Sequence, residues 1–298
     1  MSMLLPLDIK ASSMKAESHH LFSKFRFPSL GMVAAPPEVP VEIIGNQLLF
    51  SLANDFNFLD WGSPKMKYPS LFVDFTNSDH NIINIQHSIA QYYGQQLEKD
   101  PETFEKPLLY TVDTRKFPTQ FGQEEIQDLI ESIGSVIEKE NIRCVFLYGA
   151  SGFFNQSFYD FVSKLKRLTI EKNACIIITH VIANVMFERK DHDAGSYREA
   201  LSHSMIHDSH IEASAIFDWI WFSTISPLDI IKLNFDRSGT ANSPAGSLLV
   251  VNKIIQRIDR IAVNGPVKSS SASTGAPSSL FAFYRGIAPV VMPLLFEK

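Results

Sequence analysis

The chain has 298 residues, of which 45% are hydrophobic and 20% are charged, and its formal net charge at pH 7 is −5. This composition is ordinary for a globular protein, and the length suits one large domain or two small ones. The acidic balance excludes nucleic-acid binding by the surface as a whole, so any such contact needs a local basic patch or a basic partner.

The first 67 residues predict an irregular arm that leads into the folded domain. Three prolines lie within residues 36–40, and proline fixes φ and lacks the N–H group that helices and central strands use. We therefore exclude a regular helix or a central strand at residues 34–40. The structure of the mixed, apolar stretch 43–61 stays open.

A regular alternation of strands and helices begins at residue 68. Apolar stripes at helical spacing predict helices over residues 82–93, 123–140 and 158–168. Continuous apolar runs predict strands over residues 70–75, 108–112, 144–148 and 175–179. Strands of this kind joined by helices favour right-handed βαβ units and a mainly parallel sheet that helices cover on both faces.

The pattern changes after residue 180. Residues 182–212 are polar and rich in histidine, which is typical of a helix and loop, and three strand-like runs at 219–224, 230–235 and 247–251 predict an antiparallel meander. The domain ends near residue 264. Residues 265–279 have low complexity and predict a mobile linker. The apolar tail 280–298 is expected to dock on the sheet or on a partner.

The cysteines and the N-terminus indicate the compartment. Cys144 and Cys175 each lie inside an apolar run, and no CxxC pair exists, which favours buried free thiols in a reducing compartment. The first residues have neither the basic start nor the apolar core of a signal peptide. No apolar run reaches the ~20 residues that span a bilayer. We expect a cytoplasmic protein, with or without access to the nucleus, that makes no membrane contact.

The turn after the strand at 70–75 is where we expect a nucleotide-binding α/β protein to carry its phosphate loop. Such a loop needs glycines, a lysine and a hydroxyl group. The segment from Asp74 to Asn81 has no glycine and no lysine, and Asp74 and Asp79 would repel phosphate. The end of the strand at 144–148 also lacks the carboxylate that would help to hold magnesium. These absences predict that the chain neither binds a nucleotide cofactor nor hydrolyses ATP.

Two alternative enzymatic sites have residues of the right type. Ser151 follows a strand and precedes a helix, as the serine of a nucleophile elbow does, and His180 ends the next strand. Phe153 replaces the second glycine of that motif, so a capped strand-to-helix turn explains the segment better. His203 and His207 share a helix face near Asp208, as metal ligands do, but the stretch is polar enough to be a solvated helix.

Other candidate contacts are basic or aromatic. Arg115 and Lys116 follow the second of these strands at the carboxyl edge of the sheet, where α/β proteins bind ligands, and are our candidates for a phosphate or RNA contact. Trp219 and Trp221 form an aromatic cluster that belongs to the core or to an interface. Together with Phe281 and Phe283 in the tail, they are our candidate partner contacts.

The order of elements resembles that of RecA-type ATPases, and within that class the catalytically bare subunits of the Elongator accessory subcomplex. The stretches that carry this resemblance are Tyr159–Val162 leading to Lys172–His180, Ser238–Ala241 leading to Ala245–Lys253, and Phe281–Gly286. The resemblance implies an α/β, RecA-like domain over residues 68–264, with a mainly parallel central sheet flanked by helices and a C-terminal antiparallel meander. It also implies a non-enzymatic, pseudo-ATPase scaffold in a hetero-oligomer, which supports tRNA wobble-uridine modification and contacts tRNA through the assembly.

A second resemblance leads to a different function. The unit from Leu109–Asp113 through Ile142–Gly149 is similar to the strand–helix–strand unit of proteasome-assembly chaperones, in which Ser29–Val33 would be a glycine turn. This similarity fades after residue 155, whereas the RecA-like pattern continues. The sequence therefore favours the assembly subunit, with the chaperone and a serine- or metal-dependent hydrolase as alternatives.

Overall fold

The computed structural model describes residues 20–21, 25–59, 62–76, 79–113, 122–154, 157–182, 213, 215–225, 231–236, 247–251 and 254–257. Four α-helices lie in these ranges: α1 (Val41–Asn54), α2 (Asp79–Leu97), α3 (Gln123–Lys139) and α4 (Phe158–Glu171). Two short 3₁₀ turns, η2 (Pro101–Thr103) and η4 (Ala150–Phe153), accompany them. Within the described ranges, no helix is both long enough and apolar enough to span a bilayer.

The strands form one small sheet and one large sheet. β1 (His20–Leu21) and β2 (Phe25–Arg26) are an antiparallel pair. The large sheet contains β3 (Ser29–Ala35), β4 (Ser70–Asp74), β5 (Leu108–Thr111), β6 (Cys144–Tyr148), β7 (Cys175–Val181), β8 (Trp219–Ile225), β9 (Ile231–Asp236), β10 (Ser247–Val251) and β11 (Ile254–Arg257). Its order is β11-β10-β9-β8-β3-β7-β6-β4-β5.

The strand directions confirm the predicted fold class. All pairs among β3 to β8 are parallel, so six strands form the parallel sheet of a RecA-like α/β domain. β8, β9, β10 and β11 then pair antiparallel in sequence, as predicted for the C-terminal meander. The parallel strands β3, β4 and β6 are almost entirely buried, as expected for a sheet covered on both faces.

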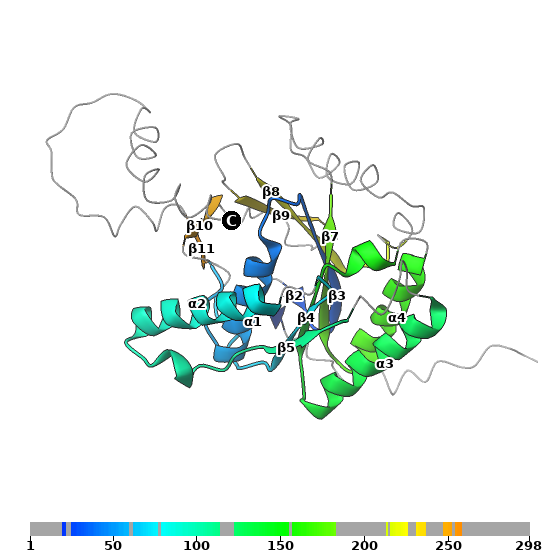
Figure 1. Ribbon diagram of the computed structural model, residues 1–298, viewed down its shortest axis with the longest axis horizontal. Helices are drawn as coiled ribbons and strands as arrows, with labels where there is room; N and C mark the ends of the chain where they lie inside the picture. The colour runs from blue at the N-terminus through cyan, green and yellow to red at the C-terminus, as the bar shows by residue number, and fades with distance from the viewer. Residues whose placement is uncertain are drawn as a thin grey trace, which may run out of the picture.

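The helices cover the two faces in pairs (Figure 1). α1 and α2 pack together over one face, and α3 and α4 pack together over the other. This division follows from the right-handed crossover rule, because the chain moves toward β5 through α1 and α2 and back toward β3 through α3 and α4. Stacked aromatic pairs fill both layers, such as Phe72 on Phe146 under α1 and Phe154 on Phe161 beneath α4.

The prediction of an irregular N-terminal arm is wrong over residues 29–35, which form a strand, and the stretch from residue 43, whose structure the sequence left open, begins inside a helix. β3 lies in the middle of the sheet, between β7 and β8, and α1 follows it after a turn that contains all three prolines. The prolines exclude regular structure only within that turn. They leave β3 before it and α1 after it unaffected, because Pro40 stands at the N-cap, where a missing N–H group costs nothing.

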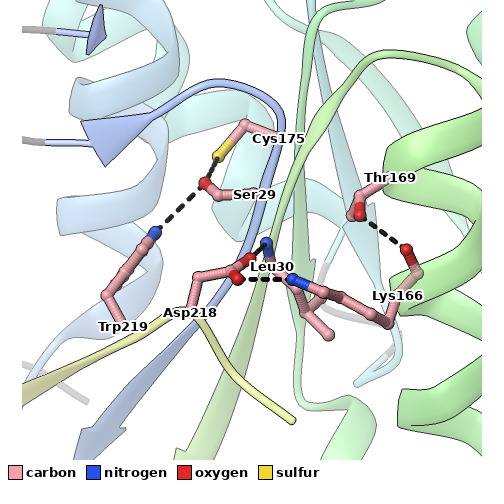
Figure 2. Close-up of polar contacts among 7 residues, drawn as sticks. All are labelled: Ser29, Leu30, Lys166, Thr169, Cys175, Asp218 and Trp219. Carbon is pink, nitrogen blue, oxygen red and sulfur yellow. Dashed lines mark hydrogen bonds and ion pairs between the residues drawn. The ribbon is translucent and has the colours of Figure 1, made fainter. Parts of the chain in front are cut away.

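Polar contacts hold the strands together at the amino edge of the sheet (Figure 2). Asp218 accepts a hydrogen bond at 2.7 Å from the backbone N–H of Leu30 and forms an ion pair with Lys166 on α4. The indole of Trp219 donates to Ser29 Oγ at 3.2 Å, and Ser29 Oγ lies 3.5 Å from Cys175 Sγ. These contacts link β3, β7, β8 and α4.

The structure confirms that both cysteines are buried free thiols. Cys144 and Cys175 are free, buried thiols at register-paired positions of β6 and β7. Contact with the Cys175 thiol and complete burial together raise the pKa of Cys144 well above the ordinary thiol value, which keeps it in the unreactive protonated form.

Candidate ligand site at the carboxyl edge of the sheet

The loop between β3 and α1 occupies the position of a phosphate loop in this fold. It follows the first strand of the parallel sheet and leads into the first helix, so the phosphate-loop position is residues 36–40 and not the turn after β4. The earlier placement was wrong because β3 was not predicted as a strand, which made β4 seem the first.

This loop has few backbone donors to offer a phosphate. Pro36, Pro37 and Pro40 have no N–H group, and the loop contains no glycine and no lysine. The N–H of Val39 donates to the carbonyl of Pro36 at 3.1 Å, and that of Val41 donates to Val39 at 2.8 Å. A phosphate loop works by directing free N–H groups at the anion, and here at least two of them are used within the loop.

The first turn of α1 adds a negative charge at the same place. Glu42 is half-buried there, and its side chain is hydrogen-bonded by the hydroxyl of Tyr148 at the end of β6. Burial raises the pKa of Glu42 above its ordinary value, and repulsion from Asp74 adds to this rise. Burial also raises the pKa of Tyr148, with a further contribution from the charges of Glu42 and Asp74.

Asp74 is the second carboxylate of this edge. It ends β4, is fully buried, and accepts hydrogen bonds at 2.7 Å from both the backbone N–H and the hydroxyl of Thr76. Such an Asx-type turn gives the carboxylate a structural role in ending the strand. With Glu42 beside it, the edge repels a triphosphate instead of attracting one.

The turn after β6 is shaped by one glycine. Gly149 has a φ of 78°, and a Cβ atom at this position would lie 2.6 Å from Cγ2 of Thr76. Its N–H donates to Oγ1 of Thr179 on β7 at 2.8 Å. The end of β6 therefore contributes Tyr148 and a tight turn, without the acidic residue of a magnesium site, as the sequence predicts.

The geometry disfavours a nucleophile elbow at Ser151. The strained residue of the turn is Gly149, whereas Ser151 lies within the 3₁₀ turn η4 and does not have a positive φ. Ser151 and His180 are both buried, with 7% and 5% exposed. A covalent hydrolase needs an exposed nucleophile that a substrate can reach.

Several predicted site residues lie outside the described residues. These are Arg115 and Lys116, the histidine-rich segment with His203, His207 and Asp208, and Phe281 and Phe283 in the tail. Among the residues that are described, no group of three or more His, Cys, Asp or Glu side chains is arranged to hold a metal ion.

Trp219 and Trp221 lie in the core, so they are not available to a partner. Their exposed fractions are 3% and 0%. Trp219 packs over Gly31 of β3, and the ring of Trp221 meets that of Phe58 edge to face, with 6.4 Å between the ring centroids. The sequence allowed two interpretations of this aromatic cluster, a core position or an interface. The structure places both tryptophans in the core.

Sequence reasoning missed the cluster of Glu42, Asp74 and Tyr148. The local signal for this cluster was Glu42, which comes just after the turn with the three prolines. This glutamate indicates a site only once β3 is known to precede that turn. In comparisons with known proteins, no family model and no curated protein matches the chain.

Proposed function

We propose that this chain is a non-catalytic, RecA-like subunit of a hetero-oligomeric assembly. The observation that supports the proposal is the loop between β3 and α1, in which prolines and Glu42 replace the glycines and the lysine of a phosphate loop. A subunit that cannot hold the triphosphate contributes to an assembly through its surfaces.

The resemblance stated above supports a particular type of assembly. We propose that the partners are the other subunits of an Elongator-type accessory complex. Such a complex takes part in tRNA wobble-uridine modification. Because the chain has a net charge of −5, tRNA contact in such a complex would come mainly from basic partner surfaces.

Nucleotide binding by the isolated chain tests the first part of the proposal. Titration with a fluorescent ATP analogue, with magnesium and with EDTA, should give no saturable binding at millimolar nucleotide. Saturable, magnesium-dependent binding followed by turnover would refute a non-catalytic role.

Purification of the tagged full-length chain from its native cell tests the second part. We expect stoichiometric co-purification of other RecA-like subunits and of the tRNA-modifying enzyme that they serve. Recovery of proteasome α-subunits would instead identify an assembly chaperone. Recovery of the chain alone, as a stable monomer, would count against any assembly role.

A further inference from the structure

Four small polar residues lie side by side at the amino edge of the parallel sheet. They are the first residues of β3, β7, β6 and β4, which are neighbours in this order: Ser29, Cys175, Cys144 and Ser70. The strand pairing places them in register, with Ser29 opposite Cys175, Cys175 opposite Cys144, and Cys144 opposite Ser70. All four are buried, and the two thiols stand together in the middle.

The geometry of the two cysteines is compatible with a disulfide. Both face the core layer of α1 and α2, and their thiols are hydrogen-bonded to each other. Neighbouring strands are about 4.8 Å apart, which lies within the Cα separation of roughly 4.4–6.8 Å that a disulfide spans. A bond between Cys144 and Cys175 would therefore join β6 and β7 without a change of strand register.

Bond formation would alter a contact that leads to the centre of the sheet. Ser29 Oγ lies 3.5 Å from Cys175 Sγ and accepts a hydrogen bond at 3.2 Å from the indole of Trp219 (Figure 2). An S–S bond is only about 2 Å long, so closing it draws Cys175 Sγ toward Cys144 and away from Ser29. The state of the sulfur atoms is thus transmitted through Ser29 to Trp219 on β8.

The surroundings of the thiols decide when an oxidant can reach them. Both cysteines are 0% exposed, and the contact with Cys175 together with burial raises the pKa of Cys144, so the closed edge protects them. Two aromatic rings of the same core cluster, Phe27 and Tyr68, lie at its margin with 9% and 7% exposed, each two residues before its strand begins. Local opening of this edge gives an oxidant access without global unfolding.

We propose that Cys144 and Cys175 form a peroxide-sensitive dithiol that closes into a disulfide between β6 and β7. Hydrogen peroxide oxidises one thiol to a sulfenic acid and releases water. The second thiol then attacks the sulfenic sulfur, which forms the S–S bond and releases a second water. The two thiols lose two protons and two electrons, and the peroxide takes up both. This inference goes beyond the proposed assembly function and does not depend on it.

The full-length chain suits a direct test, because it contains only these two cysteines. The reduced chain is treated with hydrogen peroxide in native buffer, catalase stops the reaction, and the chain is unfolded in guanidinium and labelled with N-ethylmaleimide. We expect both labels to be lost together, with a mass decrease of two hydrogen atoms. A non-reducing peptide map should link the Cys144 peptide to the Cys175 peptide, and dithiothreitol should restore both thiols.

Two serine variants and the tryptophan fluorescence supply the controls. Cys144→Ser and Cys175→Ser, made separately, should give no monomer that has lost hydrogen. Peroxide should change the tryptophan emission of the wild type, and dithiothreitol should reverse the change, whereas neither variant should show a reversible change. If a serine variant folds poorly, the peptide map of the wild type still decides the question.

Three results would overturn the proposal. The native chain could keep both labels at a peroxide dose that links the two cysteines of the guanidinium-unfolded chain. The cysteines could gain oxygen atoms without becoming linked, or the disulfide could join two chains, which a non-reducing gel would reveal. Each of these results would make the two thiols ordinary core side chains without a redox role.

Discussion

Replacing Gly31 with alanine tests whether the packing of β3 against Trp219 holds the centre of the sheet. A Cβ atom at Gly31 would lie 2.0 Å from Cζ2 and 2.2 Å from Cε2 of the Trp219 ring, far inside van der Waals contact. The indole is 3% exposed, so it has no open space to move into. Relief requires a shift of β3 or of β8.

The magnitude follows from two losses. Overpacking of a well-packed core costs about 1–3 kcal/mol and occasionally more. Moving the indole also breaks its hydrogen bond to Ser29, which contributes about 1 kcal/mol. We expect Gly31→Ala to lower the free energy of unfolding by about 2–4 kcal/mol, which is a fall in Tm of roughly 4–16 °C for a domain of this size.

Urea unfolding followed by circular dichroism measures this change. The control is Gly152→Ala, because a Cβ atom built at Gly152 meets nothing within 4 Å, and its effect should stay within about 0.5 kcal/mol. Trp219→Leu in the Gly31→Ala background should restore part of the loss, since the clashing ring is removed. A Gly31→Ala protein as stable as the Gly152→Ala control would refute the packing of Trp219 over β3.

Three further substitutions test the polar contacts at opposite edges of the sheet. The pKa of Glu42 is raised, mainly by burial and further by Asp74, so its charged form costs stability above that pKa, and the cost vanishes below the ordinary value of 4.5. Glu42→Gln should therefore raise Tm at pH 7–8 and leave it unchanged near pH 4, and an equal effect at both pH values would contradict this linkage. Asp218→Ala should cost about 1–3 kcal/mol because it leaves the buried N–H of Leu30 without its acceptor. Lys166→Ala removes only a partly exposed ion pair and should cost less than about 1 kcal/mol, so comparable losses in urea unfolding would show that the ion pair is the important contact.

Much of the fold was predictable from residue 68 onward, because each element there carries its own periodic signal. The helix predicted at 123–140 is α3 (Gln123–Lys139), and the apolar run at 144–148 is β6 (Cys144–Tyr148). These segments repeat apolar residues at the spacing of one element, and that spacing is a local property of the chain.

The central strand was missed because its identity depends on partners far away in the sequence. Ser29–Ala35 contains small residues, including Gly31, that have weak strand propensity. They fit between β7 and β8 because Trp219, almost 190 residues later, fills the space that a side chain at Gly31 would need. Because this strand was not predicted, the phosphate-loop position was expected in the turn after β4 and not in the turn after β3.

The sequence by itself determined which side chains a phosphate loop could use: residues 36–40, 75–78 and 149–157, which stand before α1, α2 and α4, contain no lysine. Only the tertiary structure decided that the relevant turn is Pro36–Pro40, that Glu42, Asp74 and Tyr148 meet beside it, and that Trp219 and Trp221 are core residues. The physical reason is that burial and electrostatic repulsion depend on distances between atoms, and strand order brings distant residues together in a way that local periodicity does not record.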